Sequence, residues 1–176
     1  MTAPNFCKTP RVLSGALLVV LIAQTVVVAC SCAWSGPFLS VASSADVIVY
    51  GTVLRYGNES RGVKLSMDVQ VREVLKGQES RKTIRVWGDN GAQCRPYVSS
   101  FPVGTEWIWA MQHLPPDTKG PHGESPNDYT IWVCGGNWLQ VQGNQVSGHV
   151  SSKMVTDPEQ QVSFNELRQQ IKAWKP

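Results

Sequence analysis

The chain has 176 residues, which is the length of one ordinary domain preceded by a short leader. Its 42% hydrophobic and 16% charged residues are typical of a globular protein, and no low-complexity tract or internal repeat is present. The formal net charge is +3, and two of the positive charges, Lys8 and Arg11, lie near the N-terminus. No basic stripe interleaved with aromatic residues follows, so we expect no nucleic-acid partner.

An uncharged apolar run covers residues 12–28 and is followed by the small residue Ala29. A positive segment, an apolar core and a small residue before the cleavage point are typical of a secretory signal peptide. We therefore predict a signal peptide over residues 1–29, cleavage between Ala29 and Cys30, and one mature domain over residues 30–176. The alternative is a retained anchor, although the run is shorter than the roughly 20 apolar residues of a spanning helix. A cleaved chain would be secreted, to a periplasm or the extracellular space, where disulfides persist.

The same junction also fits lipid attachment. The sequence Val27-Val28-Ala29-Cys30 is similar to the motif at which bacterial lipoproteins are cleaved and lipidated on the cysteine sulfur. Cleavage before Cys30 removes Cys7 and leaves four cysteines, which two disulfides would pair. Lipidation of Cys30 would leave three, one of them unpaired. We favour a disulfide-bonded Cys30, and we expect a membrane partner only if Cys30 is lipidated.

Short β-strand patterns follow one another after a loop and a short helical turn over 40–46. The clearest strand is 63–71, where apolar and polar residues alternate, so one face packs on a core and the other meets water. Gly51 inside the first strand predicts a bulge or a barrel bend, and Gly143-Asn144 predicts a hairpin turn. The predicted strands cover 47–54, 63–71, 82–87, 104–111, 129–134, 138–141 and 145–150.

A helix is predicted near the C-terminal end of the sequence, after Ser163. Ser163 is a suitable N-cap, and Glu166 completes a capping box. One apolar face follows from the helical spacing of Phe164, Leu167, Ile171 and Trp174. Many short strands followed by one helix predict a mainly β fold, a small closed barrel or sandwich with the helix packed on it.

Four cysteines in order, with strands between them, resemble a known family. Cys30-Ser31-Cys32, followed by Cys94 and Cys134, resembles the N-terminal netrin-like domain of tissue inhibitors of metalloproteinases. Two shorter stretches also match that domain, namely Ala45-Asp46-Val47-Ile48, which opens its first strand, and the turn Val74-Leu75-Lys76-Gly77. The resemblance covers nearly all of residues 30–174.

The resemblance implies an OB-fold-like closed barrel with a C-terminal helix, and the disulfides Cys30–Cys94 and Cys32–Cys134. The chain departs from the family in two ways, because no further cysteine pair remains for the third disulfide of that domain and no second, cysteine-rich domain follows. It is therefore similar to a single-domain, bacterial-type relative.

The function implied by the resemblance is inhibition of a zinc metalloprotease, the expected partner. After cleavage, the α-amine and carbonyl oxygen of Cys30 could form a five-membered chelate with the catalytic zinc of the protease. An α-amine has a pKa of about 8, so part of it is neutral and able to donate to zinc at neutral pH. Ser31 would point into the specificity pocket beside the zinc. The implied contact residues are Cys30, Ser31, Cys32, Ala33, Asn90, Gly91, Ala92 and Gln93.

Two disulfides could instead only stabilise a small extracellular barrel, since a native disulfide is worth about 2–5 kcal/mol. The alternative function is therefore a non-inhibitory binding or structural module of the cell envelope, anchored through Cys30 if that residue is lipidated. We expect no cofactor of the protein's own and no enzyme activity, because nucleophile and phosphate-loop motifs are absent and His113, His122 and His149 lack metal-ligand spacing. Asn58-Glu59-Ser60 is a glycosylation sequon.

Overall fold

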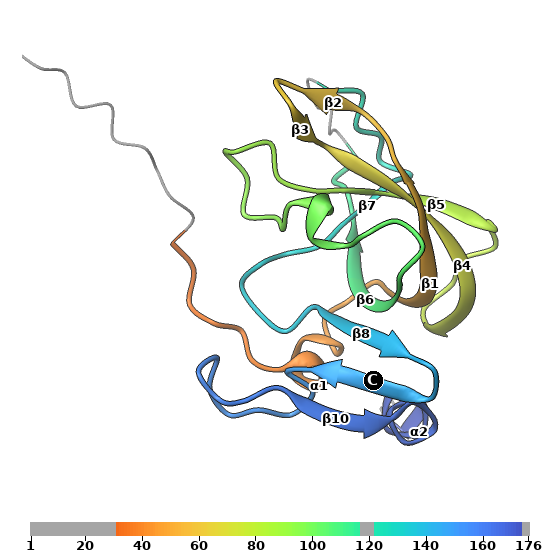
Figure 1. Ribbon diagram of the computed structural model, residues 1–176, viewed down its shortest axis with the longest axis vertical. Coiled ribbons are helices and arrows are strands. Elements are labelled where there is room, and N and C mark those ends of the chain that lie inside the picture. The colour runs from red at the N-terminus through yellow and green to blue at the C-terminus, as the bar shows by residue number, and fades with distance from the viewer. Residues whose placement is uncertain (1–30, 117–121, 174–176) are drawn as a thin grey trace, which may run out of the picture.

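The computed structural model describes residues 31–116 and 122–173, which form a mainly β structure (Figure 1). A short helix, α1 (Phe38–Val41), precedes the first strand, and α2 (Phe164–Ala173) follows the last. A single 3₁₀ turn in the described residues, η1, covers Val98–Ser100. The strands are β1 (Val47–Tyr56), β2 (Glu59–Ser60), β3 (Val63–Lys64), β4 (Ser66–Lys76), β5 (Thr83–Trp87), β6 (Glu106–His113), β7 (Tyr129–Thr130), β8 (Trp138–Gln142), β9 (Gln145–Gly148) and β10 (Gln160–Ser163).

Five of these strands close a barrel in the order β1, β4, β5, β7 and β6, because β6 pairs back onto β1. Neighbouring barrel strands are antiparallel except β5 and β7, which are parallel. This closed barrel with one C-terminal helix is OB-fold-like, and it confirms the predicted fold class. Strands β8, β9 and β10 continue the sheet from β6, with α2 beside them.

The barrel wall is buried on both faces where β1 and β6 run. Val47 and Val49 point into the barrel interior, where they meet Trp109 and Met111. Ile48, between them, points outward into a second apolar cluster. That second cluster joins the barrel to α1, α2 and the β8–β9 hairpin, and its members include Phe38, Leu75, Ile108, Leu139, Phe164, Leu167 and Ile171. Alternation along β1 therefore separates two cores rather than a core and solvent.

Gly51 lies at an irregularity of the β1–β4 pairing, as predicted. The register shifts between Tyr50 and Gly51, and a Cβ atom on Gly51 would lie 2.5 Å from the carbonyl oxygen of Gln70. No side chain fits there without moving the backbone of β4, so the glycine permits the two strands to bend together.

Several predicted boundaries were wrong. The segment predicted as one strand over 63–71 is divided between β3 and β4, and the strand predicted over 129–134 ends at Thr130. The helical turn predicted over 40–46 begins earlier, at Phe38. Strand β10 was not predicted, and neither was β2, which lies between the predicted strands over 47–54 and 63–71. The hairpin at Gly143-Asn144 is confirmed by the β8–β9 pairing.

The N-cap of α2 is confirmed, because the backbone N–H of Glu166 donates to Ser163 Oγ at 3.1 Å. The reciprocal half of the predicted capping box is not formed. The Glu166 carboxylate accepts instead from Gln170 Nε2, at 3.4 Å. Phe164, Leu167 and Ile171 are buried as expected, and Trp174 lies outside the described residues. Neither helix of the described chain has the length and apolar character needed to cross a membrane.

Lys76, at the end of β4, fixes the turn that leads from α1 into β1. Its ammonium donates to the carbonyl oxygens of Ala42, Ser43 and Ala45, each at 2.8 Å. These carbonyls lie at and beyond the end of α1, where a helix leaves its last C=O groups without intrahelical partners.

Replacing Lys76 by Met keeps the aliphatic stem and removes all three hydrogen bonds. We expect the free energy of unfolding to fall by about 1.5–3 kcal/mol, because charged hydrogen bonds to partly buried acceptors are lost. Urea denaturation measures the loss. The matched control is Lys82→Met at an exposed lysine, for which a change of less than about 0.5 kcal/mol is expected. Equal stabilities of the two variants would contradict the role given to Lys76.

Candidate functional site

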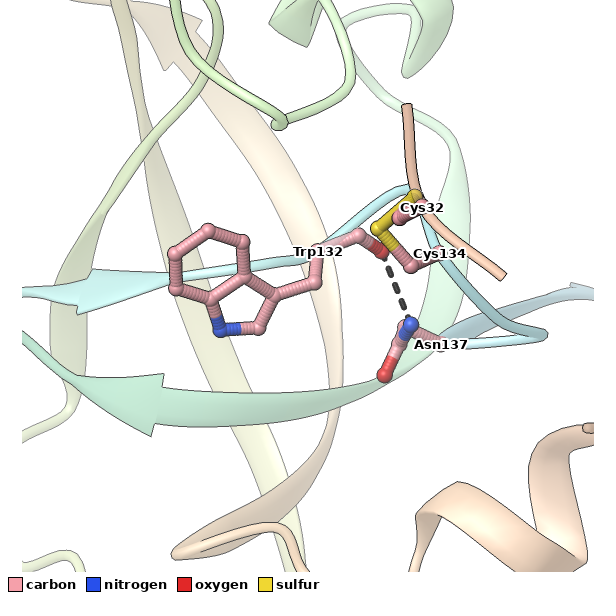
Figure 2. Close-up of a disulfide and its surroundings, with 4 residues drawn as sticks. All are labelled: Cys32, Trp132, Cys134 and Asn137. Carbon is pink, nitrogen blue, oxygen red and sulfur yellow. Dashed lines mark hydrogen bonds between the residues drawn. A yellow bond between two sulfur atoms is a disulfide. The ribbon is translucent and has the colours of Figure 1, made fainter. Parts of the chain in front are cut away.

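The first described residues are fixed to the segment that follows β7. Cys32 forms a disulfide with Cys134 (Figure 2), as the resemblance implied. The backbone N–H of Ser35 donates to the carbonyl oxygen of Cys134 at 2.5 Å. Gly136 in turn donates its N–H to the Gly36 carbonyl at 2.9 Å. A disulfide and two backbone hydrogen bonds therefore fix residues 32–36 against residues 134–136.

The far end of this segment is fixed to another part of the chain. Phe38, the first residue of α1, donates its backbone N–H to the carbonyl oxygen of His149 at 2.7 Å. The Trp34 ring packs edge-on against the His149 ring, with 6.3 Å between ring centroids. Attachments at both ends restrict the path of the N-terminal segment, which runs into α1 along one side of the molecule (Figure 1, orange).

The loop over residues 89–94 also contacts the segment that follows β7. Val133 donates its backbone N–H to the Cys94 carbonyl at 3.1 Å, one residue before the disulfide at Cys134. Cys94 is itself disulfide-bonded, and its expected partner Cys30 lies outside the described residues. The predicted cleavage point, Ala29/Cys30, lies outside them as well. Residues 133–134 thus contact both the end of this loop and the N-terminal segment.

Side-chain and backbone contacts shape the loop. Asp89 Oδ1 accepts the N–H of Gln93 at 2.7 Å, and Asn90 Oδ1 accepts the N–H of Ala92 at 3.0 Å. The base of the loop is closed by a hydrogen bond of 3.0 Å from Asp89 N–H to the Pro96 carbonyl. These turn contacts are the kind that Asp and Asn side chains form within short loops.

A buried ion pair attaches the loop to the chain before β7. Arg95 Nη1 lies 2.9 Å from Glu124 Oε1, and the two side chains are only 8% and 5% exposed. Arg95 follows Cys94 directly, so the pair fixes the loop next to its disulfide.

Most of the predicted contact residues lie on the surface. Ser31, Cys32 and Ala33 are exposed, as are Gly91 and Ala92, whereas Asn90 and Gln93 are half-buried. Residues 133–134 lie between the two groups, which are far apart in sequence. The predicted contact residue Cys30 is outside the described chain.

Two surface residues of this region were not predicted. Trp132 and Val133 were assigned to a strand over 129–134, but the chain leaves the sheet after Thr130. Trp132 is 40% exposed and Val133 37%. The Trp132 carbonyl accepts a hydrogen bond of 2.8 Å from Asn137 Nδ2 (Figure 2), and its indole N–H donates to Gln112 Oε1 at 2.7 Å. Two exposed apolar residues therefore directly precede the disulfide-bonded Cys134 in the chain.

Histidines do not create a metal centre in the described chain. Residues 31–116 and 122–173 contain no group of three or more His, Cys, Asp or Glu side chains placed to hold a metal ion.

The sequon residue Asn58 is exposed, and its Nδ2 donates to the His122 carbonyl at 2.7 Å.

A polar network was also not predicted and lies at the turn between β4 and β5. The Glu79 carboxylate is 4% exposed and lies 2.6 Å from Arg81 Nη2. It also accepts a hydrogen bond of 2.9 Å from the hydroxyl of Tyr129, the first residue of β7. Burial raises the pKa of Glu79, but the hydrogen bonds from Arg81 and Tyr129 outweigh it and lower that pKa to about 2. Burial, with Glu79 nearby, raises the pKa of Tyr129 to about 12.

This network predicts a pH-dependent stability. The pKa of Glu79 is about 2 in the folded protein against 4.5 for an unperturbed glutamate, so ionised Glu79 contributes about 3 kcal/mol. That contribution is complete above a pH of about 4.5 and is lost as the pH falls toward 2. Urea denaturation at several pH values should therefore show the stability advantage of the wild type over Glu79→Gln shrinking between pH 5 and pH 3. An advantage that is constant over this range would contradict the assignment.

Asp68 remains in both proteins of this comparison and serves as an internal reference. Its burial raises the pKa, but hydrogen bonds from Arg85 and Arg55 lower it overall. The acid sensitivity that Asp68 contributes is therefore common to the wild type and Glu79→Gln, and it cancels in their difference.

No protein-family model matches this chain, and no curated protein matches it. The function is therefore inferred from the arrangement of the chain's own residues. The Cys32–Cys134 disulfide is compatible with an extracytoplasmic location.

Proposed function

We propose that the protein is a secreted inhibitor of zinc metalloproteases that acts through the terminus created by cleavage before Cys30. The proposal extends the resemblance to the netrin-like domain of tissue inhibitors of metalloproteinases. The observation that carries it is the exposed segment Ser31–Ala33. The Cys32–Cys134 disulfide attaches this segment to residues 133–134, which also contact Cys94 at the end of the loop over residues 90–93.

Because residues 31–33 are already held by the disulfide, binding to a protease should cost less free energy of ordering. Association costs free energy for every flexible group that becomes ordered, and a segment that is already ordered avoids part of that cost. Cys30 is two residues from Cys32, so its amine and carbonyl oxygen would start from a restricted set of positions. A catalytic zinc keeps one position open for water or substrate. The amine and carbonyl oxygen would displace that water and occupy the metal in place of substrate.

The surroundings of the terminus suit a protein partner. Trp132 and Val133 are exposed and precede the disulfide-bonded Cys134, and aromatic residues are enriched where proteins bind one another. Gly91 and Ala92 are small and exposed at the tip of the neighbouring loop. They leave space for the rim of a protease cleft on that side, while the small side chain of Ser31 would enter the pocket beside the zinc.

The experiment compares two forms that differ by one residue at the terminus. One begins at Cys30 and the other carries an additional alanine before it, both with their disulfides formed. Against a panel of zinc endopeptidases, we expect the Cys30 form to inhibit at least one. The extended form should be at least 100-fold weaker, or about 2.7 kcal/mol, because its amine no longer lies next to the Cys30 carbonyl. Equal inhibition by both forms, or none by either, would contradict the proposal.

The alternative is a non-inhibitory module of the cell envelope, anchored through a lipid on Cys30. Mass spectrometry of the unreduced mature protein from its native host distinguishes the two. The inhibitor requires an N-terminal Cys30 with a free amine, linked to Cys94, beside the Cys32–Cys134 link. A diacylglyceryl thioether on Cys30 would exclude the Cys30–Cys94 link and favour the envelope module.

A further inference from the structure

A pocket of about 730 Å³ lies between the β4–β5 turn and the first residue of β7, away from the disulfide region. Its volume is within the range of small-molecule sites. Polar side chains dominate the lining, which includes Gln78, Ser80, Arg81, His113, Asn127 and Tyr129. None of these residues belongs to the proposed inhibitory surface.

The Glu79 carboxylate in this pocket is fully engaged by the protein. Oε1 accepts the backbone N–H of Arg81 at 2.7 Å and the guanidinium Nε at 3.0 Å. Oε2 accepts from Nε at 3.0 Å, from Nη2 at 2.6 Å and from the Tyr129 hydroxyl at 2.9 Å. An ionised carboxylate has about four acceptor positions. Glu79 therefore has little capacity left for a ligand and acts to orient Arg81.

Arg81 keeps one edge of its guanidinium group available. The Glu79 contacts use Nε and Nη2, and the Arg81 side chain also interacts with the Tyr129 hydroxyl. Nη1 makes no further hydrogen bond to a residue of the described chain. The side chain is 39% exposed, and its guanidinium carbon lies 5.4 Å from the centre of the Tyr129 ring. The ion pair with Glu79 and the Tyr129 ring hold the Arg81 guanidinium in place. Its remaining N–H groups are therefore oriented in advance to donate to an acceptor of a ligand.

The remaining polar groups supply further donors. His113 is exposed and its ring lies 4.6 Å from the Tyr129 ring, centre to centre. The backbone N–H of His113 is already bonded to Asp46 Oδ2 at 2.8 Å, so a ligand would meet the ring rather than this N–H. Gln78 and Asn127 add side-chain amides, and Ser80 adds a hydroxyl. Each of these side chains can donate as well as accept a hydrogen bond, so together with Arg81 they can satisfy a ligand with acceptor oxygens.

We propose that this pocket binds a small molecule bearing a carboxylate, which accepts hydrogen bonds from the free edge of Arg81. A planar carboxylate matches one edge of a guanidinium group. A phosphate dianion fits less well, because Arg81 is the single Lys or Arg side chain among the described lining residues and the neighbouring Glu79 repels a second negative charge. The site is independent of the proposed inhibitory activity and of the state of Cys30.

The test is an NMR titration of the mature, disulfide-bonded protein with N-acetylglycine, followed in ¹H–¹⁵N spectra. Saturable shifts are expected for the side-chain amides of Gln78 and Asn127 and for Arg81 Nε–H. N-acetylglycinamide, which has the same size but no charge, and inorganic phosphate should each bind at least tenfold more weakly. No saturable shift with N-acetylglycine, or equal binding of the amide or of phosphate, would overturn the proposal.

Two variants separate loss of the site from loss of the fold. Glu79→Gln with Arg81→Met removes both charges, so no unpaired carboxylate is left buried. Ser80→Phe leaves the ion pair intact and fills the pocket from an exposed position. Each should weaken N-acetylglycine binding at least tenfold, while Ser99→Phe, an equivalent change at an exposed residue outside the pocket, should not. Wild-type affinity in the folded Ser80→Phe variant would overturn the location of the site.

Discussion

Replacing Cys32 and Cys134 by serine is expected to lower the free energy of unfolding by about 2–5 kcal/mol. The disulfide joins residues separated by 102 positions, so its loss releases a long loop in the unfolded chain. The native protein also loses the covalent link that fixes residues 32–36. Urea denaturation measures the stability, and Ser99→Ala at an exposed serine is the control that should leave it unchanged.

The same substitution should reduce inhibition more than it reduces the folded fraction. The barrel does not depend on Cys32 for its strand pairing, so the β-sheet should persist while the N-terminal segment loosens. Hydrogen exchange of the Ser35 and Gly136 amides, both bonded across this junction, should become faster than exchange in β4. Full inhibitory potency in a variant whose Ser35 amide exchanges freely would show that a fixed terminus is unnecessary.

Replacing Arg95 by Met is expected to cost about 3–5 kcal/mol of unfolding free energy. The Glu124 carboxylate is 5% exposed, and removing its partner leaves a buried charge without compensation. The double variant Arg95→Met, Glu124→Gln should recover part of the loss, because the uncompensated charge is then gone. Denaturation in urea at neutral pH gives the three stabilities.

An exposed ion pair provides the matched control for this prediction. Arg55 lies 2.8 Å from Asp68, but the Arg55 side chain is 73% exposed and Asp68 retains Arg85 as a partner. Arg55→Met should therefore cost less than about 1 kcal/mol. Similar losses for Arg55→Met and Arg95→Met would mean that burial of the Arg95–Glu124 pair does not determine its effect.

Local patterns in the sequence were sufficient for several parts of the fold. Alternation over 63–71 located most of β4, the Gly143-Asn144 turn located the β8–β9 hairpin, and Ser163 marked the start of α2. Each depends on residues close in sequence. The end of β7 at Thr130 depends instead on contacts of Val133 with Cys94 and of Cys134 with Cys32. Alternation alone therefore extended that strand too far.

The candidate site residues divide in the same way. The cysteine order and the resemblance predicted residues 31–33 and the loop over 90–93 as contact residues, and both segments connect to residues 133–134. Trp132 carried no such signal, because its exposure is decided by where the sheet ends. Glu79 and Tyr129 meet only through the pairing of β7 beside β5, across 50 residues. No local pattern links two such positions, so the second pocket could not be predicted.

Direct evidence for the chelating terminus would come from a zinc endopeptidase that the protein inhibits, with its zinc replaced by cobalt. The visible absorption of cobalt reports its coordination. Adding one equivalent of the form beginning at Cys30 should change the spectrum as the amine and carbonyl oxygen bind the metal, and the alanine-extended form should leave it unchanged. Inhibition by the Cys30 form without any change in the cobalt spectrum would contradict chelation.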